Sequence, residues 1–271
     1  MLERLKIPKD EPLVTTTCYV TGPKQVRDAL IELMVHEDGN GLQHFDFDRI
    51  IPMPPELERT TPGQFAVAGL AILAREGIPD TAEALKVALG SFGSTDPLQD
   101  MLEAGWGIDA GVTKIEELIP YLKNNVHMGA RMQKEASETL AAYRATGHTD
   151  WLTWSVDNWG AGWNADQFEL LYHGPGSGVL RFRFVTVDFP RPVFHALVQR
   201  LPNLRFVCNW KTEFNNKGEE EFGVTERRMF SHKKADDQAC ASIRSAPDSI
   251  LVVDLDRERD RRLGRPWSAP S

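Results

Sequence analysis

Two strand–helix–strand patterns, separated by a long stretch without strand signals, limit this chain to a small set of folds. In the first pattern, β-branched residues over 13–20 predict a strand that ends at a Gly-Pro turn. Apolar residues three and four apart over 26–34 predict a helix. Apolar and polar side chains then alternate over 45–51, which predicts a second strand.

The same order returns in the second half of the chain, with a hairpin added on each side. A glycine-rich turn is expected over 174–178, because Gly-Pro-Gly interrupts the alternating pattern there. A short apolar strand over 249–255 is expected at an edge of the sheet. The remaining elements predicted for this half are strands over 168–172, 179–188, 204–209 and 222–229 and a helix over 193–201.

About 90 residues between the two patterns show only helical periods, and a structureless loop of that length is uncommon in a compact domain. Helices are expected around 65–73, 82–89, 115–122 and 132–143. Two split units of this kind predict an α+β fold: a ferredoxin-like βαββαβ plait with an antiparallel sheet, interrupted by an α-helical insertion. We expect residues 1–57 and 151–255 to be the halves of the plait, 58–150 the insertion and 256–271 a flexible tail.

Composition excludes several classes of protein. The chain is 41% hydrophobic and 26% charged, which is typical of globular proteins, and no apolar run approaches the length of about 20 residues that spans a bilayer. The first residues do not resemble a secretory signal, so we expect a cytoplasmic protein. Cys18, Cys208 and Cys240 form no CxxC pair, which argues against a disulfide framework, a zinc site or an iron–sulfur cluster. We predict no metal and no cofactor.

Four of the seven tryptophans lie within residues 151–163. The indoles, together with neighbouring glycines and amides, could form an exposed platform for a base, a sugar or a peptide. They could instead fill the joint between the helical insertion and the sheet, and the general burial of large aromatic side chains favours this second interpretation. The candidate binding residues of this segment are Asn158, Trp159, Gly160, Gly162, Trp163 and Asn164.

The same segment resembles a known family. The stretch NWGAGWNA over 158–165, preceded by Trp151 and Trp154, is similar to the NWGxxWNA signature of the YubB ferredoxin-like family. The stretches IIPMPPEL over 50–57 and PNLRF over 202–206, and Cys18 with the residues after it, resemble further blocks of that family. The resemblance implies a ferredoxin-like fold and an origin in phages, prophages or conjugative plasmids. It implies no known reaction, so no catalytic residue is transferred.

Two small groups of residues could in principle be catalytic or bind a cation. Cys18 and His195 could meet as nucleophile and base, although a single buried cysteine is the commoner arrangement. Asp46 and Asp48, beside His44, could bind a cation or act as acid and base, although a solvated strand face is the favoured explanation. We therefore predict no catalytic residue, and an enzyme of unknown reaction with a site near Trp159 stays as an alternative.

Nucleic acid is the other alternative partner, because aromatic side chains on a ferredoxin-like sheet can stack single-stranded bases. Aromatic and basic residues alternate on the predicted central strands, and this alternation equally describes a sheet with aromatics toward the helices and arginines toward water. A net charge of −8 favours the second interpretation. The aromatic residues are Phe182, Phe184, Phe206 and Trp210, and the basic residues are Arg181, Arg183, Arg205 and Lys211.

Together with the resemblance, which implies a phage or mobile-element origin and a bacterial host cell, these patterns predict a non-catalytic accessory protein. We expect it to bind a protein of the host or of the element and not a membrane. Its acidity would suit blocking the nucleic-acid groove of a host defence complex, in the manner of an anti-CRISPR protein. The alternative is a single-stranded nucleic-acid-binding protein that uses the face of the sheet.

Overall fold

Five strands form the main sheet, in the order β4-β5-β1-β6-β7, and every neighbouring pair is antiparallel. A computed structural model describes residues 11–92, 95–172 and 178–223 of the chain, and these belong to one compact unit. The predicted α+β class with an antiparallel sheet is thus confirmed. The strands are β1 (Val14–Thr21), β4 (Asp166–Tyr172), β5 (Val179–Thr186), β6 (Arg205–Thr212) and β7 (Lys217–Phe222).

Strand β1 occupies the centre of the sheet, where it pairs with β5 on one side and β6 on the other, and its many β-branched residues favour the extended backbone. Its buried residues, Val14, Thr16, Cys18 and Val20, face the core, and the residues between them are more exposed. The register places Cys18 opposite Phe182 on β5 and opposite Cys208 on β6. The strand predicted over 13–20 is therefore confirmed as β1.

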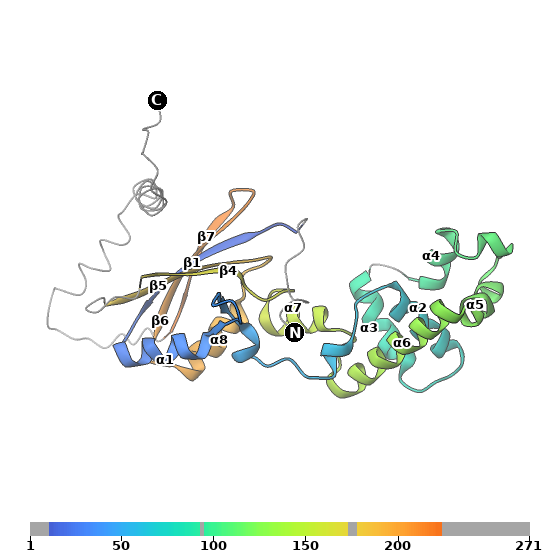
Figure 1. Cartoon of the computed structure of the whole chain (residues 1–271), viewed down its shortest axis with the longest axis horizontal. Helices are drawn as coiled ribbons and strands as arrows, with labels where there is room; N and C mark the ends of the chain where they lie inside the picture. Colours follow the sequence, from blue (N-terminus) through green and yellow to red (C-terminus); the bar gives the residue numbers. More distant parts are fainter. Residues whose placement is uncertain (1–10, 93–94, 173–177, 224–271) are drawn as a thin grey trace, which may run out of the picture. The chain divides into compact units, whose positions relative to one another are not determined.

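Helices α1 (Lys24–Met34) and α8 (Arg191–Arg200) lie on one side of this sheet (Figure 1). Leu30 and Met34 from α1, and Phe194 and Leu197 from α8, enter the same apolar cluster as the inward residues of the strands. Fully burying a side chain of this size contributes about 1.5–3 kcal/mol, so the two helices and the sheet stabilise each other. Both helices were predicted from apolar residues three and four apart.

The second strand of the first unit differs from its prediction. Only its first residue, Phe45, belongs to a strand: β2 (Val35–Glu37) pairs with β3 (Gln43–Phe45) in a separate two-stranded sheet, and a 3₁₀ helix, η2 (Phe47–Arg49), follows. The Asp46 carboxylate accepts a hydrogen bond from the Asp48 backbone N–H, and Asp48 accepts one from the backbone of Met53. These side-chain caps turn the backbone, so the prediction of a strand over 45–51 is wrong after Phe45.

The stretch between the two patterns is helical, as predicted. Gly69 lets helix α2 pack closely against α6, because a Cβ at this position would lie 2.7 Å from both Ala136 Cβ and Met132 O. No described helix is long and apolar enough to cross a bilayer. The helices of this stretch are α2 (Gln64–Arg75), α3 (Thr81–Phe92), α4 (Pro97–Glu103), α5 (Ile115–Asn124) and α6 (Val126–Thr146), with 3₁₀ turns η3 (Leu57–Arg59) and η4 (Ile108–Ala110).

Several predictions fall wholly or partly outside the described residues. They are the turn over 174–178, the strand over 222–229 beyond residue 223, the strand over 249–255 and the tail over 256–271. The division into plait halves and insertion stays a prediction.

Candidate functional site

The tryptophan-rich segment forms helix α7 (Trp151–Trp159) and the turn that follows it. The Asp150 carboxylate accepts the Thr153 backbone N–H at the start of the helix, a standard N-cap interaction. At the other end, Gly160 adopts a left-handed conformation with φ of 76°, and a Cβ there would lie 2.7 Å from Pro192 Cδ of α8. Glycine is therefore required at 160 both for the backbone angle and for the contact between α7 and α8.

Trp154 and Trp159 form an inner pair that belongs to the core. Their rings lie edge to face with centroids 5.5 Å apart, and Trp159 also meets Phe47 at 5.9 Å. The Trp159 indole Nε1–H donates to the carbonyl oxygen of Ile51 at 2.9 Å, and its side chain is completely buried. The interpretation of Trp159 as part of an exposed platform is therefore wrong, because a buried ring with a satisfied N–H cannot receive a ligand without opening the core.

The two asparagines of the segment hold the backbone. The buried Asn164 amide accepts the Phe47 backbone N–H at 2.8 Å and donates to Asp46 Oδ1 at 2.8 Å, so it ties η2 to the start of β4. The Asn158 amide donates to the Trp154 carbonyl oxygen at 3.0 Å. Gly162 is buried where a Cβ would lie 2.8 Å from Leu152 Cδ1. The interpretation of Asn164 and Gly162 as parts of an exposed platform is thus also wrong, because both residues are buried.

Trp151 and Trp163 form an outer pair at the surface. Their centroids are 6.2 Å apart, edge to face, and both side chains are half-buried. Val156 of α7 is 50% exposed. Of the two tryptophans among the candidate binding residues, Trp163 is therefore the one that keeps part of its side chain at the surface in this conformation.

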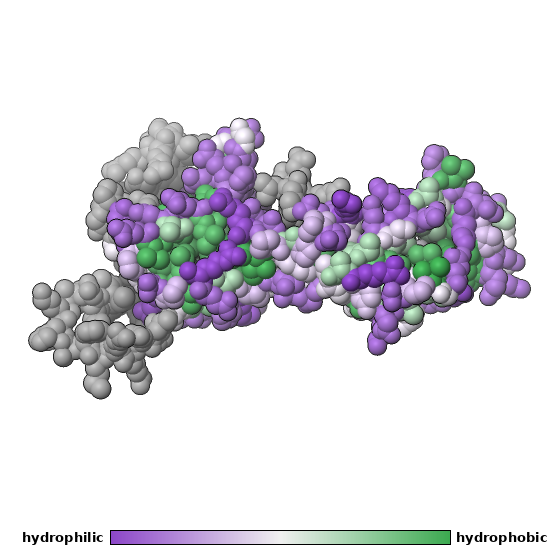
Figure 2. Space-filling model, turned by 90° about the horizontal axis from the view of Figure 1, so that it is seen from below, coloured by the Kyte–Doolittle hydropathy of each residue, from purple (hydrophilic) through white to green (hydrophobic). Residues whose placement is uncertain are grey.

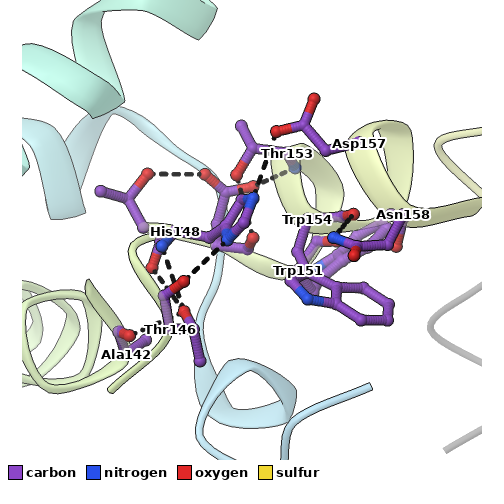
Figure 3. Close-up of polar contacts among 11 residues, drawn as sticks. Ala142, Thr146, His148, Trp151, Thr153, Trp154, Asp157 and Asn158 are labelled. Carbon is purple, nitrogen blue, oxygen red and sulfur yellow. Dashed lines mark hydrogen bonds and ion pairs between the residues drawn. The ribbon is translucent and has the colours of Figure 1, made fainter. Parts of the chain in front are cut away.

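A polar joint connects the end of α6 to α7 (Figure 3). His148 lies between the Asp157 carboxylate, at 3.1 Å from its Nε2, and the Thr146 carbonyl oxygen, at 3.2 Å from its Nδ1. Both neighbours can only accept hydrogen bonds, so the two bonds form together only when both ring nitrogens carry a proton. The Trp151 backbone N–H donates to Thr60 Oγ1 at 3.1 Å, which attaches the start of α7 to the turn after η3.

The basic candidates lie on the side of the sheet opposite the helices, where two of them are paired with glutamates. Arg183 donates to Glu169 at 2.7 Å, and Arg205 donates twice to Glu221 at 2.8 Å. Arg181 lies over the Tyr19 ring at 5.3 Å, and Lys211 is exposed.

The aromatic candidates lie on the other side. Phe182, Phe184 and Phe206 are completely buried toward the helices, and the Trp210 ring packs against Gly218 of β7. The interpretation in which the aromatic side chains face the helices and the arginines face the open side of the sheet is therefore confirmed. These four aromatic rings offer no stacking platform on the open face.

Cys18 and His195 do not meet, and Asp46 and Asp48 lie close together as caps of the η2 turn. His195 is exposed and packs edge to face on Phe222, whereas Cys18 is completely buried and lies opposite Cys208 of β6. His44 lies 3.4 Å from Asp38, and burial raises the pKa of Asp48, which accepts the Met53 N–H. Within residues 11–92, 95–172 and 178–223, no three His, Cys, Asp or Glu side chains gather as metal ligands.

One exposed apolar surface was missed by the sequence reasoning. Ile108 is 72% and Val126 80% exposed, and both adjoin α5. A Cβ at Gly107 would lie 2.8 Å from Val112 of the same loop and 3.3 Å from Tyr121, so the turn carrying Ile108 packs against α5 at Tyr121. We call Ile108, Val112, Tyr121 and Val126 the α5 surface. The sequence signal for this turn is the group of three closely spaced glycines, Gly105, Gly107 and Gly111, all of which adopt positive φ angles.

Comparisons with known proteins add little to this description. No protein-family model and no curated protein matches the sequence. Among solved structures, the chain is similar to the crystal structure of the protein api92 from Yersinia pseudotuberculosis, described by the family model DUF1281. The identity is 11% and the TM-score 0.36, over 79% of this chain and 94% of that one, and a similarity at that TM-score carries no argument about fold or function.

Proposed function

We propose that this chain is a non-catalytic accessory protein that binds a basic partner protein through the α5 surface. The observation that carries the proposal is the exposure of Ile108, whose turn packs on the half-buried Val112 and Tyr121, together with the exposed Val126 just after α5 in the chain. Isolated apolar side chains on a surface need no explanation, but neighbouring ones that stay in water are typical of binding sites. The space-filling view shows apolar residues at the surface of the helical region among hydrophilic ones (Figure 2).

The charges around the α5 surface specify the chemistry of the partner. Residues 100–124 hold five acidic side chains and two basic ones. Lys123, one of the two, forms an ion pair with Glu76 of α2. A partner with lysines or arginines around an apolar side chain therefore complements this surface, and its association would be steered by charge. The acidic side chains are Asp100, Glu103, Asp109, Glu116 and Glu117.

The proposal includes a ferredoxin-like plait as the scaffold and a mobile element as the origin. Strands β4, β5, β1 and β6 lie side by side in that order, all antiparallel, with α1 and α8 following β1 and β5 along the chain. This order supports the plait, with β7 as an added edge strand. The similarity of residues 158–165 to the YubB signature supports a phage or plasmid source, and the chain would act in the bacterial cytoplasm, for instance against a host defence complex.

Single-stranded nucleic acid is the competing partner, and one observation favours it: Tyr19 lies at the centre of the open sheet face with Arg181 beside it. The glutamates that pair Arg183 and Arg205 reduce the positive potential of that face, so we place the binding function on the α5 surface.

A displayed library of random peptides about four helical turns long tests the proposal, with the full chain as bait. We expect enrichment of peptides that combine apolar side chains with lysine or arginine, and loss of that binding in Ile108→Asp. Leu42→Asp, at a 60% exposed apolar residue of the β2–β3 turn, is the matched control and keeps binding. Enriched peptides that bind Ile108→Asp unchanged would overturn the proposal, as would retention of an oligonucleotide that Arg181→Glu abolishes.

A further inference from the structure

We propose that Cys18 and Cys208 are a dithiol that a peroxide converts to a cross-strand disulfide. The inference is independent of the α5 surface. The two residues stand directly opposite each other on the adjacent antiparallel strands β1 and β6. Both side chains belong to the apolar cluster between the sheet and the helices, and both are completely buried.

The backbone geometry already suits the bond. Directly opposite residues of an antiparallel pair have Cα atoms about 4.5–5.5 Å apart, within the range of about 4.4–6.8 Å seen in disulfides. Both side chains belong to the same buried cluster, so the two thiols lie on the same face of the sheet at directly opposite positions. No strand has to shift register for the bond to form.

The neighbours of the pair leave the two sulfurs to react with each other. Cys18 lies opposite Phe182 on its other side, and Cys208 lies opposite Glu220 of β7. Within the described part of the chain these are the two free cysteines, and Cys240 lies outside it. A sulfenic acid on either sulfur would therefore meet the other thiol before any other nucleophile that the structure describes.

The reaction balances with hydrogen peroxide as the oxidant. The sulfur of one cysteine, as thiolate, attacks a peroxide oxygen; the O–O bond breaks, a sulfenic acid forms, and the departing hydroxide takes up a proton to become water. The second sulfur then attacks the sulfenic sulfur, the S–O bond breaks, and the second water leaves. The two thiols lose two electrons in total, which the peroxide receives.

Burial controls when this reaction occurs. It raises the pKa of the Cys18 thiol well above its usual value, and the neighbouring Cys208 raises it further. The thiolate is the reactive form, so the folded sheet protects the pair. Oxidation should therefore proceed mainly while β1 and β6 separate. Once formed, the bond would join residues 18 and 208 and restrict the unfolded chain between them.

The test uses the full chain carrying Cys240→Ser, treated with hydrogen peroxide in buffer and in subdenaturing urea. We expect a mass loss of about 2 Da, a peptide linking residues 18 and 208, faster reaction in urea, and reversal by dithiothreitol. The oxidised protein should unfold at a higher urea concentration than the reduced one. Cys18→Ala and Cys208→Ala, as parallel controls, should show no loss of 2 Da.

Several results would overturn the inference. One is the gain of single oxygen atoms on either cysteine without a cross-link, and another is disulfide-linked dimers of the chain. A third is an oxidised monomer that unfolds at the same urea concentration as the reduced one. Because wild-type and Cys240→Ser proteins report these outcomes directly, the test does not depend on whether the alanine variants fold.

Discussion

Replacing Trp159 by phenylalanine tests whether the tryptophan-rich segment is core. Phenylalanine keeps a ring beside Trp154 and Phe47 but removes the Nε1–H that satisfies the Ile51 carbonyl oxygen at 2.9 Å. Leaving a buried acceptor unpaired costs about 1–3 kcal/mol. The smaller ring leaves a void at a completely buried position, which adds about 1–2 kcal/mol. We therefore expect Trp159→Phe to lower the free energy of unfolding by about 2–5 kcal/mol.

Urea denaturation followed by far-ultraviolet circular dichroism measures this loss, provided that the slope of the transition is unchanged. Trp163→Phe is the matched control, because Trp163 is half-buried and its indole N–H has no hydrogen bond recorded in the described structure. We expect the control to cost less than about 1 kcal/mol. Equal costs for the two variants, or a cost below about 1 kcal/mol for Trp159→Phe, would refute the assignment of Trp159 to the core.

Three further substitutions test the packing and the electrostatics. Gly69→Val should destabilise the chain by about 1–3 kcal/mol, because its Cβ would collide with Ala136 across the α2–α6 contact; no loss in a thermal melt would contradict that contact. Asn164→Ala should cost about 1–3 kcal/mol by leaving the buried Phe47 N–H unpaired, and an unchanged urea midpoint would argue against this role. Burial raises the pKa of Asp48 above its usual value of about 3.8, so its ionisation opposes folding as pH rises from that value through the raised pKa. Asp48→Asn should therefore gain stability relative to wild type across that pH window, and a constant difference in melting temperature between pH 3 and pH 7 would show that the Asp48 charge has no such effect.

Local sequence patterns were sufficient to predict the central strand of the sheet and the two helices that pack on it. Strand β1 and helices α1 and α8 are recognisable because each places apolar residues on one face with the period of its own secondary structure. The failure at 45–51 has a specific cause. Phe45 and Phe47 alternate with Asp46 and Asp48 as a strand would, but the two carboxylates accept backbone N–H groups and turn the chain into a 3₁₀ helix. Pattern alone does not distinguish a solvated aspartate from a capping one.

The candidate site was predictable only in outline. The bias of residues 151–163 toward tryptophan indicated an important segment, and the general burial of indoles favoured a structural role. Which pair is inside depends on long-range partners: Trp159 faces Phe47 and the Ile51 carbonyl, more than a hundred residues earlier in the chain. The exposure of Ile108 and Val126 likewise depends on how α5 packs, which their own sequence does not encode.

The most direct test of the proposed function is the affinity of one enriched basic peptide for the full chain, measured by fluorescence anisotropy at low and high salt. We predict binding that weakens as salt rises, because acidic side chains surround the α5 surface. We also predict at least about a tenfold weaker affinity for Ile108→Asp, as expected when a central apolar anchor is lost from an interface. Salt-independent binding, or equal affinity for wild type and Ile108→Asp, would contradict the assignment of the partner site to the α5 surface.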